Sequence, residues 1–186
     1  MFVYPLDGLA IIFVYKFFDW PWNSTNISFI SILAGFKHMA GFWKSKKVIV
    51  TGAAGFIGSH LAEELVKQGA DVTAFIRYNS RNSWGNLEFL DESVKKSIKI
   101  VAGDLRDLYL LKKAVKDQDI VFHLGASIAI PYSYINPHDF IQTNVVGTTN
   151  VLTAALEANV QRFIHTSTSE AYGTPDKIPI PETAAM

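Results

Sequence analysis

Two short segments of this 186-residue sequence contain residue types that could carry out chemistry. The first is HTSTSEAYG, residues 165–173, in which Thr168, Ser169 and Glu170 follow a short strand-like run. A carboxylate can accept a proton, and a neighbouring hydroxyl can hydrogen-bond to a reacting oxygen. Thr168, Ser169 and Glu170 are therefore candidate catalytic residues.

The second segment is TGAAGFIGSH, residues 51–60, with glycines at GxxGxxG spacing. It lies between an apolar β-branched run and a helical pattern, which is where a phosphate-binding turn occurs in α/β proteins. Glycine allows the backbone to turn tightly and to approach a pyrophosphate, and the helix N-terminus then supplies unpaired N–H groups. The pattern predicts a dinucleotide site.

The elements that must position these segments alternate between strand and helix from Lys47 onward. Strands are predicted at 47–52, 71–76, 98–104, 119–126 and 161–167, and helices at 56–70, 108–117 and 137–158. Residues 77–91 read as a polar connection, and Ile141, Val145, Leu152 and Leu156 form one stripe on the last helix. The alternation predicts an α/β fold with a doubly wound, Rossmann-like parallel sheet.

Composition excludes several classes of site. The sequence has no cysteine, so disulfides, thiolate catalysis and cysteine-based metal sites are excluded. The five histidines show no metal-ligand spacing, and we expect no metal. A net charge of zero gives no indication of a nucleic-acid partner.

Residues 1–43 differ in character from the domain that we place at 44–186. Two apolar runs of about ten residues are half of the ~20 needed to cross a bilayer, and no secretory signal is apparent. We interpret the segment as an extension foreign to the domain, with Met39 as a natural start. A membrane-surface anchor is the alternative. We expect a cytoplasmic protein.

Five ordered motifs in residues 47–183 resemble the extended branch of the short-chain dehydrogenase/reductase superfamily. They are TGAAGFIG, GDLRD (103–107), HLGAS (123–127), TNVVGT (143–148) and STSEAYG (167–173). Thr168-Ser169-Glu170 matches the triplet of sugar nucleotide 4,6-dehydratases of the GDP-mannose type, whereas epimerases generally have a small or hydroxyl residue in place of Glu170.

The resemblance implies which residues bind the cofactor. Asp104 would contact the adenine, and Asn144 would either touch the ligand or support the pocket. Gly125 departs from the usual alanine, which should loosen the packing slightly, and His123 is interpreted as structural. The full predicted set is Gly52, Gly55, Phe56, Ile57, Gly58, Arg77, Asp104, Leu105, Leu124, Gly125, Ala126 and Asn144.

The end of the second strand bears on the choice of cofactor. Ile76 stands where the family usually has an acid that binds the ribose hydroxyls, and Arg77 and Arg81 follow. Without that carboxylate a 2′-phosphate is not repelled, and a guanidinium can hold it. We therefore favour NADP over NAD; the alternative is that Arg77 lies on the adenine or faces solvent.

The same resemblance assigns roles in dehydration. Oxidation of the sugar at C4 makes the C5 proton acidic; Glu170 would remove it, Ser169 would assist the departing C6 hydroxyl, and Thr168 would hold the C4 oxygen. The family also uses a Tyr-x-x-x-Lys pair, which does not occur after Glu170; Tyr172 is followed four residues later by Asp176. We expect the chain to be an N-terminal portion that lacks the last strands and a C-terminal substrate domain, and to be inactive alone.

Finer resemblance points to dehydratases of legionaminic-type acid synthesis, which act on UDP- or GDP-linked N-acetylglucosamine and serve cell-surface polysaccharides. Residues 130–137, IPYSYINP, would then lie over the sugar pocket or form an ordinary loop. The alternatives are a sugar nucleotide 4-epimerase and a non-catalytic dinucleotide-binding fragment. The family also implies a homodimer formed through helices that include 137–158.

Overall fold

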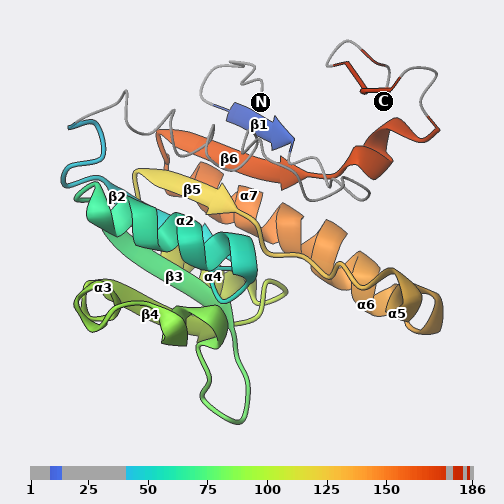
Figure 1. Cartoon of the computed structure of the whole chain (residues 1–186). Helices are drawn as coiled ribbons and strands as arrows, with labels where there is room; N and C mark the ends of the chain where they lie inside the picture. The colour runs from blue at the N-terminus through green and yellow to red at the C-terminus, as the bar shows by residue number, and fades with distance from the viewer. Residues whose placement is uncertain (1–8, 14–40, 175–177, 182–183, 185–186) are drawn as a thin grey trace, which may run out of the picture.

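The computed structural model describes residues 9–13, 41–174, 178–181 and 184 (Figure 1). A parallel sheet with strand order β1-β6-β5-β2-β3-β4 forms the centre of the molecule. Its strands are β1 (Leu9–Phe13), β2 (Lys47–Thr51), β3 (Asp71–Arg77), β4 (Ile98–Gly103), β5 (Ile120–His123) and β6 (Arg162–Ser167). The doubly wound parallel sheet predicted from the sequence is confirmed.

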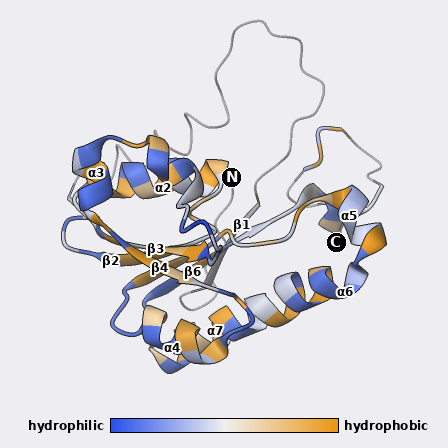
Figure 2. Cartoon of the chain, turned by 90° about the horizontal axis from the view of Figure 1, so that it is seen from below, coloured by the Kyte–Doolittle hydropathy of each residue, from blue (hydrophilic) through white to orange (hydrophobic). Residues whose placement is uncertain are grey.

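Helices cover both faces of the sheet (Figure 2). One face carries α2 (Phe56–Lys67) and α3 (Glu92–Lys96), and the other carries α4 (Leu108–Val115) and α7 (Gly147–Glu157). Three short helices, α5 (Ile130–Ile135), α6 (Pro137–Phe140) and the π-helix η2 (Ile141–Val146), lead into α7, and two 3₁₀ helices are η1 (Gly85–Phe89) and η3 (Ser169–Tyr172).

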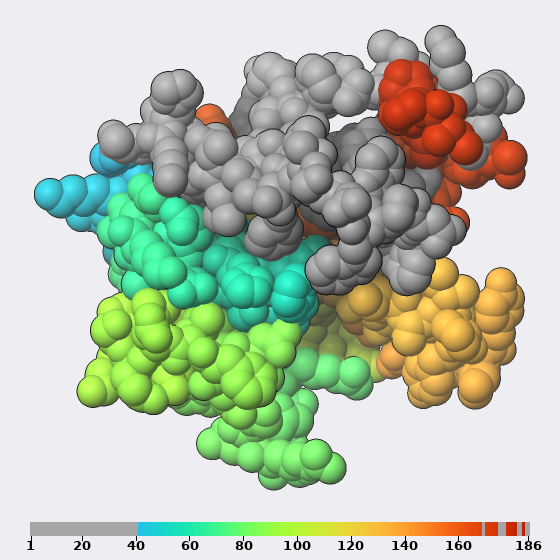
Figure 3. Space-filling view, in the orientation of Figure 1, coloured from blue at the N-terminus to red at the C-terminus, as the bar shows by residue number. Residues whose placement is uncertain are grey.

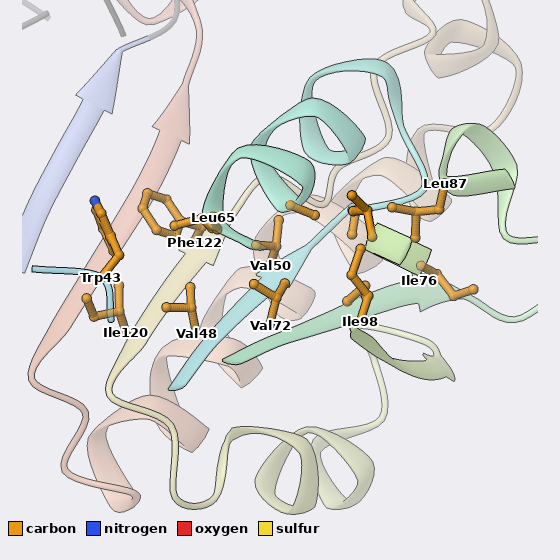
Figure 4. Close-up of a cluster of buried hydrophobic side chains, with 14 of the residues drawn as sticks. Trp43, Val48, Val50, Leu65, Val72, Ile76, Leu87, Ile98, Ile120 and Phe122 are labelled. Atoms are coloured by element: carbon orange, nitrogen blue, oxygen red, sulfur yellow. The ribbon is translucent and has the colours of Figure 1, made fainter. Parts of the chain in front are cut away.

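The strands separate two apolar cores because successive side chains point to opposite faces. On the α2 side, Val48 and Val50 of β2 pack with Leu65 (Figure 4), whereas Ile49 packs with α4 and α7 on the other side. All four side chains are fully buried. Each such burial contributes roughly 1.5–3 kcal/mol, which explains why strands covered on both faces read as continuous apolar runs.

Part of the predicted extension contacts the domain. Trp43 is 6% exposed and packs against Phe122 with ring centroids 6.0 Å apart (Figure 4), so the α2-side core begins at least one residue before the boundary we placed at 44. Leu9–Phe13 form β1, which pairs in parallel with β6. Residues 1–8 and 14–40, including Met39, lie outside the described residues, and the foreign origin of the segment stays a prediction.

The predicted helix 137–158 is divided into α6, η2 and α7. Its apolar stripe does not face the sheet: Ile141, Val145, Leu152 and Leu156 are 55%, 60%, 38% and 79% exposed. The sheet is instead contacted by a face of small residues that includes Val151, Ala154 and Ala155. No helix within the described ranges is long and apolar enough to span a bilayer.

Candidate functional site

The glycine-rich turn joins β2 to α2 at the carboxyl edge of the sheet. Gly52 has φ +69°, and a Cβ on it would lie 2.8 Å from the backbone nitrogen of Gly125. A Cβ on Gly58 would overlap the carbonyl oxygen of Gly52. The backbone of the turn is therefore packed directly on backbone, and only glycine satisfies both positions.

The N-terminus of α2 opens at this turn. Its N-cap, Gly55, has no side chain to accept a bond from the first-turn N–H groups, and the first turn contains no acidic residue. Phe56 and Ile57 are exposed, whereas Gly58 is buried against the turn. The unpaired N–H groups and the helix dipole make this end suited to an anion.

Next to the turn lies a cavity of about 130 Å³. Six residues predicted from the sequence line it: Gly52, Arg77, Asp104, Leu105, Gly125 and Ala126. They come from the ends of β2, β3, β4 and β5, so the parallel sheet brings together residues up to 74 positions apart. Four of the other predicted cofactor residues, Gly55, Phe56, Ile57 and Gly58, lie in the turn and α2. Leu124 precedes the lining residue Gly125, and Asn144 is hydrogen-bonded to the lining residue Ser127.

Four residues of the cavity wall were not predicted from the sequence: Phe75, Arg106, Ser127 and Thr143. Arg106 and Ser127 are inside the quoted motifs GDLRD and HLGAS, so adjacency to Asp104 and Ala126 was a usable signal. Thr143 enters the wall through the π-helical turn η2, whose position no sequence pattern indicated. π-Helical turns often occur at functional sites.

Asp104 is held by Arg106. The Arg106 Nε donates to Oδ1 at 2.9 Å, its terminal nitrogen lies 2.5 Å from Oδ2, and its backbone N–H also donates to Oδ1 at 2.9 Å. The hydrogen bond from Arg106 is the main reason that the pKa of Asp104 lies below its usual value. Arg106 also reaches Asp139 of α6 at 3.3 Å. With Arg77 in the same wall, the cavity holds two cations and one carboxylate.

Asn144 supports the pocket rather than lining it. Its Oδ1 accepts from the backbone N–H of Ser127 at 2.7 Å, and its Nδ2 donates to the Ser127 carbonyl at 2.9 Å. The side chain thus makes the two backbone hydrogen bonds with Ser127 that a neighbouring strand would otherwise make. Asn144 was expected either to touch the ligand or to support the pocket, and these two hydrogen bonds correspond to the supporting role.

The connection 77–91 also contributes to the site, although its sequence read only as a polar stretch. Asn79 bonds the backbone of Arg81 and Ser83, and η1 follows with Leu87 buried. The backbone N–H of Asn86 donates to the carbonyl of Ala54 at 3.0 Å. The connection therefore supports the glycine-rich turn at Ala54.

Thr168, Ser169 and Glu170 follow β6 at the same carboxyl edge as the turn and the cavity. Thr168 caps η3, and its Oγ1 accepts from the backbone N–H of Glu170 at 3.3 Å. Glu170 is exposed, and no described residue contributes an ion pair or hydrogen bond to its carboxylate. Thr168 and Glu170 do not line the cavity at Asp104. Asp176 lies outside the described residues.

Among the described residues, no three His, Asp or Glu side chains converge as metal ligands. The polar groups at the carboxyl edge are instead arranged as a turn, a helix N-terminus and a small cationic cavity. In open α/β sheets this edge is where nucleotide ligands bind.

Comparison with known proteins identifies the family. Residues 49–186 match the family described as GDP-mannose 4,6 dehydratase. The chain belongs to this family. The family resemblance predicted from the five motifs is confirmed at that level. The GDP-mannose family match does not distinguish the legionaminic subtype, which stays a prediction.

Similar proteins include both activities. The chain is 35% identical over 142 residues to the UDP-glucose 4-epimerase of Lactobacillus helveticus, covering 75% of this chain and 41% of the relative. Among solved structures, UDP-N-acetylglucosamine 4-epimerase from Methanobrevibacter ruminantium M1 in complex with UDP-N-acetylmuramic acid is 34% identical with a TM-score of 0.66, over 75% of this chain and 43% of that one.

A solved dehydratase matches equally well. DesIV, the dTDP-glucose 4,6-dehydratase from Streptomyces venezuelae with NAD and TYD bound, is 32% identical with a TM-score of 0.66. The match covers 75% of this chain and 44% of that one. The chain thus spans about two fifths of the length of these proteins, and the family membership is shown for that span.

Proposed function

We propose that this chain is the dinucleotide-binding part of a sugar nucleotide 4,6-dehydratase. The observation that carries the proposal is the placement of Thr168-Ser169-Glu170 directly after β6, at the sheet edge that also holds the glycine-rich turn. A carboxylate at this position is the residue that separates dehydratases from epimerases in the resemblance on which the proposal rests.

The turn and the cavity fit a nicotinamide dinucleotide. Gly52 and Gly58 allow the turn to pack tightly beside the cavity, and α2 offers N–H groups to a pyrophosphate. Leu105, Gly125 and Ala126 form the apolar part of the cavity wall. When bound, the nicotinamide would accept a hydride from the sugar C4 and return it to C6.

We further propose that the cofactor is NADP in preference to NAD. Arg77 and Arg106 both line the cavity, and its single carboxylate, Asp104, is already paired with Arg106. A 2′-phosphate would meet a net positive wall, and Arg77 can bind it through charge-assisted hydrogen bonds. The solved dehydratase with the same fold carries NAD, so NAD is the alternative.

Glu170 would act as the general base on a 4-keto sugar. It takes the C5 proton, and the electron pair of that C–H bond forms a C5–C6 double bond as the C6 hydroxyl leaves. Ser169 would donate a hydrogen bond to the leaving oxygen, which departs as water once it receives the proton that Glu170 removed from C5, and Thr168 would orient the C4 oxygen. We propose a UDP- or GDP-linked N-acetylglucosamine-like hexose as substrate and a cytoplasmic location.

The second candidate is a sugar nucleotide 4-epimerase, which the epimerases among similar proteins favour. The deciding experiment uses a protein that carries this chain together with a Tyr-x-x-x-Lys pair. A dehydratase yields a 4-keto-6-deoxy sugar, which is detected by its mass, 18 lower than that of the substrate, whereas an epimerase yields an isomer of equal mass. An isomeric product would overturn the dehydratase proposal.

Glu170→Gln in the same protein sharpens the assignment. The amide keeps the size of the side chain but cannot take the C5 proton, so we expect elimination to fall at least ~100-fold, a typical loss for a general base. Dinucleotide binding should persist. Unchanged elimination would show that another group removes the proton.

We also propose a homodimer through the exposed stripe of α6, η2 and α7. Ile141, Val145, Leu152 and Leu156 form an apolar face on which each side chain is 38–79% exposed, and in Figure 3 the neighbouring helices α5 and α6 project from the body of the molecule. Leu156→Lys should convert a dimer to a monomer in sedimentation measurements. Phe89→Lys, at an equally exposed position outside the stripe, is the control.

A further inference from the structure

A buried histidine connects the glycine-rich turn to helix α7. His123 ends β5 and is 1% exposed, and its register partner Thr51, which ends β2, is fully buried. The Thr51 Oγ1 lies 2.7 Å from His123 Nδ1, and the His123 Nε2 lies 2.9 Å from the Oγ1 of Thr148. Three segments thus meet at one imidazole ring.

The hydrogen bonds around Thr51 determine which nitrogen carries the proton. The Thr51 Oγ1 accepts from the backbone N–H of Gly125 at 3.1 Å and from that of Leu124 at 3.2 Å, the latter shared with the Thr51 backbone carbonyl at 3.3 Å. A hydroxyl has two lone pairs and one proton, so with both lone pairs engaged its proton must go to His123 Nδ1. Nδ1 is therefore an acceptor, and Nε2 carries the hydrogen that is donated to Thr148.

Burial favours the neutral ring that this arrangement requires. It lowers the pKa of His123 to about 3, with a smaller contribution from His165, whose ring stacks at 5.4 Å. An imidazolium would carry a second ring N–H, at Nδ1, and this hydrogen would point at a hydroxyl whose lone pairs are already engaged. The neutral Nε2–H form is the one that satisfies every partner.

The same links hold the cavity wall at two points. Thr51 binds the backbone of Leu124 and Gly125, and Asn144 binds the backbone of Ser127. Thr148 lies one turn of helix beyond Asn144, so both attachments of the wall segment 124–127 lead to the same helical segment. The wall is thereby fixed between β2 and α7.

We propose that His123, as the neutral Nε2–H tautomer, is a positioning residue that sets segment 124–127 against the glycine-rich turn and so tunes dinucleotide affinity. The proposal rests on the proposed dinucleotide-binding function. The hydrogen bonds of the His123 ring go to Thr51 and Thr148 and not to a residue of the cavity wall, so it acts through these two threonines.

The tautomer is tested by nitrogen NMR of the histidine-labelled 186-residue chain. Two-bond proton–nitrogen correlations should show one protonated nitrogen for His123, assigned to Nε2. In Thr51→Val, which removes the donor to Nδ1, the preference should weaken and the Nδ1–H form should appear. A wild-type ring protonated on Nδ1, or a tautomer indifferent to Thr51→Val, would overturn the inference.

Affinity is tested by calorimetry with NADP and NAD on the same chain. Thr148→Val should weaken binding about fivefold to tenfold, the effect of one lost buried hydrogen bond, and Thr148→Ser should restore it. Thr149→Val is the matched control, because the Thr149 hydroxyl bonds only its own helix at Val145. If the wild type binds a dinucleotide and Thr148→Val binds it equally well, the positioning role of His123 is overturned and the proposed function stands. A wild-type chain that binds neither dinucleotide would overturn the proposed function and the positioning role together.

Discussion

The carboxyl edge of the sheet has two parts that differ in how their polar groups are held. Around β2, β4 and β5, side chains bond partners distant in sequence: Asn144 holds Ser127, and His123 links Thr51 to Thr148. After β6, the hydrogen bond of the Thr168 hydroxyl is local, to the backbone of Glu170. The difference teaches that the residues proposed to bind the dinucleotide are positioned by contacts within this segment, whereas the orientation of Glu170 is not.

The largest effect is expected in the cross-linked part, from Gly52→Ala. A side chain there combines a left-handed backbone with overlap against Gly125, and we expect unfolding free energy to fall by about 4 kcal/mol and NADP binding to be lost. Urea denaturation measures the first and calorimetry the second. Gly41→Ala is the matched control, because Gly41 has φ +91° but nothing within 4 Å of the added carbon. If Gly52→Ala and Gly41→Ala lost equal unfolding free energy, the loss in Gly52→Ala would come from backbone strain alone and not from overlap with Gly125.

The next effect is a dependence of stability on pH that originates in His123. Its folded-state pKa of about 3 lies below the usual 6.5, so the unfolded chain takes up a proton first and stability falls as pH decreases between these values. The loss should be roughly 1.4 kcal/mol per pH unit, or about 3 kcal/mol from pH 6 to pH 4. Denaturation of wild type and His123→Gln at several pH values measures it.

His123→Gln should lack the part of the acid destabilisation that comes from protonation of His123. The same substitution at His60, which is exposed on α2, reports the effect of removing a surface imidazole. Parallel stability curves for the wild type and His123→Gln would contradict the assignment of a buried neutral ring.

A smaller effect concerns cofactor choice at the cavity. Removing the Arg77 guanidinium should weaken NADP binding roughly tenfold or more and leave NAD nearly unchanged, because only NADP carries the phosphate it would bind. Calorimetry on Arg77→Ala with both dinucleotides gives the ratio. Arg81→Ala, on the same connection but outside the cavity wall, should leave the ratio as it is. Equal weakening of both cofactors would place Arg77 on the part that they share.

The smallest effect is expected after β6. Glu170→Gln should change the unfolding free energy of the 186-residue chain by less than about 0.5 kcal/mol, because the carboxylate is exposed and makes no bond to a described residue. Denaturation beside Asn144→Ala, which removes the support of Ser127, makes the contrast direct. A large loss from Glu170→Gln would show that the two parts of the edge are equally cross-linked.

The sequence predicted the strands and the binding turn well because they depend on local patterns. Apolar runs such as 47–52 and 71–76 became β2 and β3, and the GxxGxxG spacing marked the turn before α2. The long helix was predicted less well: the 3.6-residue period of Ile141, Val145, Leu152 and Leu156 correctly identified a helical face, but periodicity cannot say which face meets the sheet.

By itself, the sequence determined the order of strands β2 to β6 and of helices α2 and α4, the glycines of the turn and the residue types that follow β6, since each is a property of neighbouring residues. Only the tertiary structure decided that Asn144 supports Ser127 and that the His123 ring joins Thr51 to Thr148. The physical reason is that these bonds depend on the register of parallel strands and on a π-helical turn, which bring together residues that no local pattern relates.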